Sequence, residues 1–160
     1  MKKNNNIVYT QVDVRDMDMV APLWRKLLVH HRERSAHFKE YFSRMTWEKR
    51  KKELIDKSRN GAMCIDMAKD KVTEKLIGYC ISTISENKHA ELESIYIEAE
   101  YRRCGIGDTF VKAALNWMDG HGAVRKVIAV AAGNEEALGF YAKYGFYPRV
   151  SILMQADSRE

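Results

Sequence analysis

Hydrophobic and polar positions divide the chain into short strand-like stretches and longer helical ones. The strand-like stretches are runs of apolar, often β-branched residues bounded by polar or glycine-containing turns. They are residues 7–12, 62–67, 76–85, 90–97, 126–131 and 146–154, the last forming one strand or two. Short polar turns join the second, third and fourth of these stretches, so we expect an antiparallel meander there.

Four further stretches repeat their apolar positions with a helical period. In the first, apolar residues from Val20 to Leu28 share one face, after an expected cap at Asp16 or Asp18. Pro22 fits this helix only in its first turn or at a kink. The other three are residues 47–59, which Thr46 would cap, residues 106–118, and a short helix that begins near Asn134 and ends at Gly145.

The order of these elements predicts the fold class. It is β-α-α-β-β-β-α-β-α-β, with one more strand if the closing stretch forms two. An antiparallel meander followed by a βαβ crossover predicts a mixed α/β fold, in which a sheet of six to seven strands is flanked by about four helices. A chain of 160 residues has the size of one domain, so residues 1–160 are expected to form a single domain.

The composition is that of an ordinary globular protein, with 46% hydrophobic residues. No apolar run approaches the roughly 20 residues of a membrane span, and no signal-peptide core follows the N-terminus. We therefore expect a cytoplasmic protein with no membrane partner. Cys64, Cys80 and Cys104 are odd in number and widely spaced, which favours reduced thiols over disulfides, and no metal-ligand spacing is present.

The net charge of +5 is compatible with an anionic ligand but is not by itself a signature of nucleic-acid binding. The basic run at residues 49–52 is more typical of a solvated helix face than of a binding patch. A helix-turn-helix DNA binder is disfavoured because the connection between the first two helices is long and lacks glycine. No nucleic-acid partner is expected.

A glycine-containing loop joins the strand at residues 90–97 to the following helix. Gly105 and Gly107 would let backbone N–H groups approach a ligand, and the helix N-terminus adds unpaired donors and a positive dipole end. Arg102 and Arg103 add positive charge. The loop is therefore either a phosphate cradle or a plain tight turn. It has neither the Gly-Lys-Ser/Thr ending of a P-loop nor the third glycine of a dinucleotide-binding loop.

The pattern Arg-x-x-Gly-x-Gly at residues 102–107 resembles the acyl-CoA pyrophosphate loop of the GNAT N-acetyltransferase superfamily. Residues 134–146 look like the family's Asn-x-x-Ala-x-x-x-Tyr-x-x-x-Gly-Phe helix and fill every defining position. The two motifs follow each other in the family's order, and the element order is similar to the GNAT fold from Ile7 to about Met154. The chain is identified by this resemblance as a GNAT member.

The resemblance implies acetyl-CoA as the co-substrate. Its pyrophosphate would sit on the loop residues Arg102, Arg103, Cys104, Gly105, Ile106, Gly107 and Asp108. Its pantetheine arm would add like an extra strand beside Ile95, Tyr96 and Ile97, where the fourth and fifth strands splay apart. Asn134 would bond the arm, and Tyr141 would flank the thiol end.

Amide formation needs a neutral amine, whereas an alkyl amine has a pKa of about 10.4 and is mostly protonated at neutral pH. A carboxylate base would help, directly or through water. Glu91 and Glu93 share one face of their strand with Ile95 and Ile97, unless a bulge intervenes. Glu91 matches the general-base position of histone-type GNAT members and Glu93 is the acid nearer the splay. Either could instead be a rim residue paired with Lys or Arg.

Tyr141 matches the general acid of the family, which protonates the departing thiolate, although it could also be a packed helix tyrosine. The acceptor would bind near residues 28–45, expected to be a helix end and a loop with a short helical piece. The aromatic and acidic side chains there could form a pocket for a cationic amine, or could serve packing and solvation; they are Glu33, Phe38, Glu40, Tyr41 and Phe42.

These residues favour an N-acetyltransferase that acts on the primary amine of a small molecule, a polyamine or an amino compound, by direct attack in a ternary complex. The alternatives are a protein lysine or N-terminal acetyltransferase and a catalytically silent acyl-CoA-binding regulator. Ala129 disfavours a protein N-terminus, because the related ribosomal-protein enzymes carry an acid there. A homodimer is possible, with residues 151–154 as a candidate pairing edge.

Overall fold

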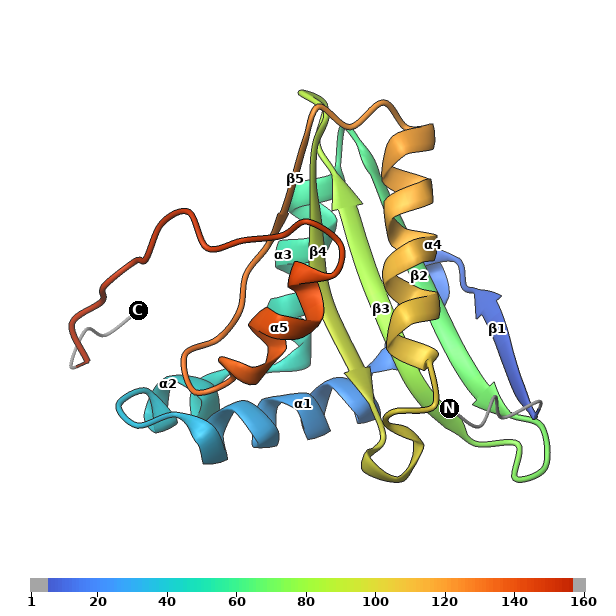
Figure 1. The fold of residues 1–160 in the computed structure, drawn as a ribbon, viewed down its shortest axis with the longest axis horizontal. Coiled ribbons are helices and arrows are strands. Elements are labelled where there is room, and N and C mark those ends of the chain that lie inside the picture. The colour runs from blue at the N-terminus through green and yellow to red at the C-terminus, as the bar shows by residue number, and fades with distance from the viewer. Residues whose placement is uncertain (1–5, 157–160) are drawn as a thin grey trace.

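One mixed β-sheet organises the computed structural model, which describes residues 6–156 (Figure 1). Its strands lie in the order β1-β2-β3-β4-β5, antiparallel up to β4, while β5 runs parallel to β4. The strands are β1 (Ile7–Gln11), β2 (Ala62–Asp70), β3 (Leu76–Ile84), β4 (His89–Ile97) and β5 (Arg125–Ile128). The predicted mixed fold and its antiparallel meander are therefore confirmed.

Helices cover both faces of this sheet (Figure 1). On one face lie the 3-10 helix η1 (Val14–Val20) and the helices α1 (Ala21–Arg34) and α3 (Trp47–Ser58), while α2 (Lys39–Arg44) packs beside α1. On the other face lie α4 (Ile106–Gly120) and α5 (Glu136–Ala142), with the short 3-10 helix η2 (Ala99–Tyr101) before them. Five α-helices thus occur in the described residues, against about four expected.

The N-terminal helical region is divided in a way that the sequence did not indicate. The Asp13 side chain, rather than Asp16 or Asp18, caps it by accepting a hydrogen bond from the backbone N–H of Arg15. The chain then forms one 3-10 segment before α1 begins, with Pro22 in the first turn of α1, where its missing N–H costs nothing. Thr46 caps α3 as predicted.

Two hydrophobic cores hold the helices to the sheet. The amphipathic face of α4 buries Ile106, Phe110, Ala114 and Met118 against one face. The other face packs on η1, α1 and α3, where Trp24 and Trp47 lie 5.6 Å apart. β3 contributes to both cores, with Cys80 and Ile84 in the core under α4 and Tyr79 and Ile81 in the other.

The predicted closing strand or strand pair is wrong. Residues 146–155 form no strand, so the described part of the chain has five strands rather than six to seven. Gly145 turns the chain with a φ of 81°, and Pro148 removes one ladder donor. The segment then runs away from the body of the protein (Figure 1), leaving Ile152 and Leu153 88% and 94% exposed. An apolar pattern alone does not supply a partner strand.

β4 contains a bulge at Glu93. Opposite it on β3, Ile81 pairs with Ser94 and the next residue, Ser82, pairs with Leu92, so Glu93 has no partner. Consequently Glu91 and Glu93 lie on the face covered by α3, whereas Ile95 packs on the opposite face. The bulge also marks where β5 leaves β4, since Leu92 and Ile128 form the last parallel pair.

None of the helices within residues 6–156 is both long and apolar enough to cross a membrane.

Candidate active site

A cavity of about 490 Å³ opens beside the C-terminal half of β4. The loop after β4, the helix α5 and the C-terminal half of α1 form its other walls. Of the residues expected to bind acetyl-CoA, all but Cys104 and Ile106 line it: Ile95, Tyr96, Ile97, Arg102, Arg103, Gly105, Gly107, Asp108, Asn134 and Tyr141. Sequence positions that are up to 46 residues apart therefore meet in one place.

The edge of β4 is open along this cavity. Its pairing with β5 ends at Leu92, so the backbone from residue 93 to 97 receives no hydrogen bond from β5. The Arg102 side chain covers part of the end, where its Nε donates to the Ile97 carbonyl at 3.0 Å and its guanidinium lies 5.7 Å from the Tyr96 ring centre. An extended molecule with amide groups can satisfy the remaining strand edge.

The loop presents free backbone donors to the same cavity. Arg103 and Gly105 have φ angles of 60° and 84°, so the chain turns through left-handed conformations at both positions before α4 begins. Among residues 6–156, the backbone N–H groups of residues 103–108 find no acceptor. Together with the positive end of α4, these donors suit a pyrophosphate.

Gly107 allows the loop to approach α5 closely. A Cβ atom built at this position would lie 3.1 Å from Cζ of Phe140 and 3.5 Å from Cδ1 of Ile97. Because both of these residues line the cavity, a side chain at position 107 would intrude into it.

Asp108 ties the loop to α5. Its carboxylate accepts hydrogen bonds from the Tyr144 hydroxyl and, at 3.1 Å, from Lys143. The hydrogen bond from Tyr144, aided by Lys143, holds the pKa of Asp108 below its usual value despite some burial. The negative charge of Asp108 is thus compensated by Lys143 where a phosphate would approach, and its backbone N–H stays free.

Tyr141 brings a hydroxyl group to the inner wall of the cavity. The residue is only 8% exposed, and burial, with a smaller effect of nearby Cys80, raises its pKa well above the usual value. The hydroxyl therefore stays protonated at neutral pH and can donate a hydrogen bond to an anion. Cys80 and Tyr141 belong to the same buried cluster.

Asn134 lies in the turn that leads into α5. Its backbone carbonyl accepts a hydrogen bond from Ala137, but no side-chain cap is formed at the start of the helix, which differs from the expected capping role. This turn packs on the end of α1: a Cβ built at Gly133 would lie 2.3 Å from the Arg34 carbonyl oxygen. Arg34 and Glu136 also form an ion pair at 2.8 Å.

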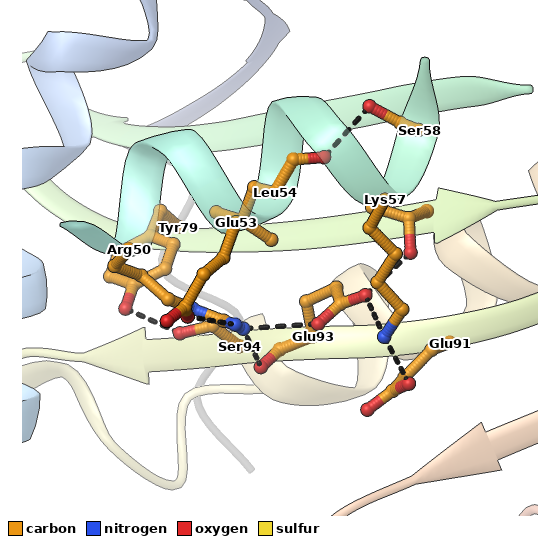
Figure 2. Close-up of polar contacts among 10 residues, drawn as sticks. Arg50, Glu53, Leu54, Lys57, Ser58, Tyr79, Glu91, Glu93 and Ser94 are labelled. Atoms are coloured by element: carbon orange, nitrogen blue, oxygen red, sulfur yellow. Dashed lines mark hydrogen bonds and ion pairs between the residues drawn. The ribbon is translucent and has the colours of Figure 1, made fainter. Parts of the chain in front are cut away.

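Glu91 and Glu93 lie outside the lining of the cavity, beneath α3 (Figure 2). Lys57 binds both carboxylates, that of Glu93 at 2.6 Å. Glu93 also binds Arg50 at 3.0 Å, and its side chain is only 2% exposed. Burial alone would lower the pKa of Lys57, but its hydrogen bonds to both acids outweigh this effect and raise that pKa.

Comparison with known protein families identifies the family of the chain. A profile described as "Acetyltransferase (GNAT) family" matches residues 26–146, which is most of the chain. The chain belongs to the GNAT family. The GNAT assignment made from the two motifs is therefore confirmed.

Relatives by sequence cover only part of this GNAT domain. A mycothiol acetyltransferase of Corynebacterium glutamicum strain ATCC 13032 is 41% identical over 59 residues, and the counterpart in strain R is 39% identical over the same length. The matched segment is 35% of this chain but only 20% of each relative, so the chain spans a small part of their length.

Solved structures share the GNAT fold over nearly the whole chain. PaiA N-acetyltransferase from Thermoplasma acidophilum, in complex with coenzyme A, is 22% identical, has a TM-score of 0.71 and covers 91% of this chain and 92% of its own. The aminoglycoside acetyltransferase meta-AAC0020 from an uncultured soil sample, in complex with trehalose, is 14% identical with a TM-score of 0.67 and covers 99% of this chain and all of its own. These similarities show the fold.

The structure also places residues in the GNAT cavity that the sequence reasoning missed. Leu27 and His30 enter it from α1. His30 lies within the expected acceptor region 28–45, but the side chains singled out there do not line the cavity: Glu33, Phe38, Glu40, Tyr41 and Phe42. Burial, then the charge of Arg34, lowers the pKa of His30 against the opposing effect of the Asn134 side chain. The helical period around Leu27 predicted a buried face, but only the packing of α1 across the cavity shows that this face also borders the site.

No three His, Cys, Asp or Glu side chains within residues 6–156 are grouped so as to hold a metal ion. Cys104 lies outside the lining with its thiol directed to the Arg102 carbonyl, and Ile106 is 1% exposed in the core. Ile106 can therefore contribute to the loop only through its backbone N–H.

Proposed function

We propose that this chain is an acetyl-CoA-dependent N-acetyltransferase that acetylates the primary amine of a small molecule. One observation carries the proposal: free amide donors, an open strand edge and the Tyr141 hydroxyl all meet at one cavity. A tight turn alone would explain the glycines, but not the open edge of β4 beside them.

The residues fit acetyl-CoA from one end to the other. The N–H groups of residues 103–108, with Arg102, Arg103 and Lys143 near them, would hold the pyrophosphate. The open edge at residues 95–97 and Asn134 would hold the amide-bearing arm. The bound thioester supplies an activated acetyl group, which the amine would attack directly in a ternary complex.

Tyr141 would assist the departing thiolate. A thiol has a pKa of about 8.5, far below that of the buried Tyr141 hydroxyl, so complete proton transfer from Tyr141 would be uphill. The hydroxyl would instead donate a strong hydrogen bond to the developing negative charge, in a site shielded from water.

The base has two kinds of candidate. Glu91 and Glu93 keep their proposed role only if a water molecule relays the proton, because both are bound to Lys57 and neither lines the cavity. His30 lines the cavity, and its lowered pKa keeps the imidazole neutral and able to accept a proton. The pH dependence of Glu91→Gln, Glu93→Gln and His30→Gln would identify the base.

A small polar amine fits the site best. The similar proteins include a mycothiol acetyltransferase and an aminoglycoside acetyltransferase, whose names indicate small polyfunctional acceptors. A protein lysine or N-terminus is the second acceptor class, and a silent acyl-CoA-binding regulator is the alternative without catalysis.

Calorimetric titration with acetyl-CoA, followed by a thiol-release assay over a panel of polyamines, amino sugars and peptides, tests the proposal. Binding with turnover on a small amine is the expected result. Turnover on peptides alone would move the acceptor to proteins, and binding without any turnover would favour the regulator. Failure to bind acetyl-CoA would refute the whole assignment.

We also propose a homodimer, in line with the expected pairing edge. β5 has a partner on one side only, and the same chain carries an exposed apolar segment that finds no strand of its own. A second copy that places this segment beside β5 would cover both. Light scattering after size-exclusion chromatography measures the mass in solution, and a monomer at all concentrations would exclude this pairing.

A further inference from the structure

Arg50, on the neighbouring helix α3, makes two hydrogen bonds to the bulged residue of β4. Its Nη2 donates to the backbone carbonyl of Glu93 at 3.3 Å and to the carboxylate of the same residue at 3.0 Å (Figure 2). The two side chains are 19% and 2% exposed, so the contact is largely shielded from water. The planar guanidinium also binds Glu53 through Nη1, so its orientation toward β4 is fixed in a way that a flexible lysine ammonium does not reproduce.

The Glu93 carboxylate is satisfied on its other side as well. Its Oε1 accepts a hydrogen bond from the Thr83 hydroxyl at 2.6 Å and lies 2.6 Å from Nζ of Lys57. A buried carboxylate with this many partners is held in one position. Burying charges gives little net stability, so this cluster is better explained by the conformation it fixes than by the free energy of unfolding.

Ser94, the residue after the bulge, is also held by a side-chain contact. The Tyr79 hydroxyl and the Ser94 hydroxyl are 2.6 Å apart, and Tyr79 is completely buried. Glu93 is therefore held by side chains of both α3 and β3, and Ser94 by a side chain of β3. Both contacts lie on the face of β4 opposite the core that contains Ile95.

The bulge determines which residues of β4 reach the cavity. Before it, β4 pairs with β5 up to Leu92; after it, residues 95–97 are free of β5 and line the cavity. Removing the extra residue would shift the register by one and exchange the faces of every following side chain. The position of Glu93 thus controls both the divergence of the strands and the side chains along the open edge.

We propose that Arg50 is a positioning residue for donor binding, which fixes the β4 bulge through Glu93 and so holds open the strand edge that receives the extended arm of acetyl-CoA. This role rests on the proposed acetyl-CoA function. Because Arg50 acts through Glu93, substitution of Glu93 is expected to impair acetyl-CoA binding as well as turnover.

The test compares Arg50→Lys and Arg50→Gln with one matched control. Glu53→Gln removes the other ion-pair partner of Arg50, 3.6 Å away, without touching β4. Both Arg50 variants are expected to weaken acetyl-CoA binding about tenfold in calorimetry, the effect of about 1.4 kcal/mol that one charge-assisted hydrogen bond supplies. The control is expected to stay within about twofold, even where Tm falls.

Amide hydrogen exchange in the ligand-free protein provides a second readout that needs no acetyl-CoA. Residues 93–97 are expected to exchange faster in Arg50→Lys than in the wild type, while β2 exchanges as before. Unchanged hydrogen exchange at residues 93–97, or unchanged acetyl-CoA affinity in a folded Arg50 variant, would refute the positioning role of Arg50. If the wild type does not bind acetyl-CoA, the proposed function fails, and exchange alone still decides whether Arg50 holds the bulge.

Discussion

At the scale of single residues, the site separates into groups that are easy and hard to find from sequence. The loop acts through its backbone, and the Tyr141 helix acts over two turns, so each leaves a compact motif in the chain. The environment of Glu91 and Glu93 leaves none. It depends on Arg50 and Lys57, about 40 residues earlier in the sequence, and on a bulge that these contacts hold.

Tyr141→Phe removes only the hydroxyl that faces the cavity. We expect kcat to fall about 100-fold, the lower range for loss of one hydrogen-bond donor to a developing negative charge, while acetyl-CoA affinity stays within about twofold. Steady-state kinetics and calorimetry on the same preparation measure the two effects. A comparable loss of affinity would instead make Tyr141 a packing residue of the cavity wall.

Gly107→Val fills the space between the loop and Phe140. Because its Cβ would already be 3.1 Å from the Phe140 ring, we expect the loop to be displaced and acetyl-CoA affinity to fall more than about 100-fold. Gly139→Ala is the matched control, since a Cβ there meets nothing within 4 Å. Wild-type affinity in Gly107→Val would show that the loop does not bind the donor.

His31 predicts a pH dependence of stability. Burial, and then the charge of His30, lowers the pKa of His31 to about 4, and its Nδ1 has no partner in the described part of the protein. The unfolded state, with a pKa of about 6.5, binds the proton more readily, so stability is lost as pH falls from 6.5 to 4. Allowing for partial exposure of the ring, we expect a loss of about 1–2 kcal/mol over this range.

Thermal unfolding of the wild type and of His31→Phe, measured from pH 7 to pH 4, checks this expectation. The variant is expected to lose less stability than the wild type, whereas His37→Ala, at an exposed position, should behave like the wild type. Parallel curves for His31→Phe and the wild type would show that the buried imidazole is not the group responsible.

At the scale of elements, periodicity identified most strands and helices, because each has one buried face. For that reason the predicted ends of β2, β3, β4 and α3 lie close to those in the structure. The failures have a common cause in contacts distant along the chain. The bulge of β4 depends on contacts with α3, and a closing strand depends on a sheet edge with which it can pair. A local sequence pattern contains neither kind of information.

At the scale of the whole molecule, the closing segment contributes little to the fold. Its apolar side chains are largely exposed, so ending the chain after Phe146 is expected to change Tm by less than about 2 °C and to leave acetyl-CoA affinity unchanged. If the proposed homodimer forms, the same truncation should yield a monomer by light scattering. A dimer that survives truncation would place the interface elsewhere.

The close contact between Gly133 and the Arg34 carbonyl links the cavity wall formed by α1 to the wall formed by α5. α1 carries His30, α5 carries Tyr141, and no side chain separates the Arg34 backbone from the turn that leads into α5. An amine that shifts α1 on binding would therefore also shift α5. By thermodynamic linkage, the factor by which the amine tightens the donor must equal the factor by which the donor tightens the amine. Each substrate would then be an allosteric effector of the other.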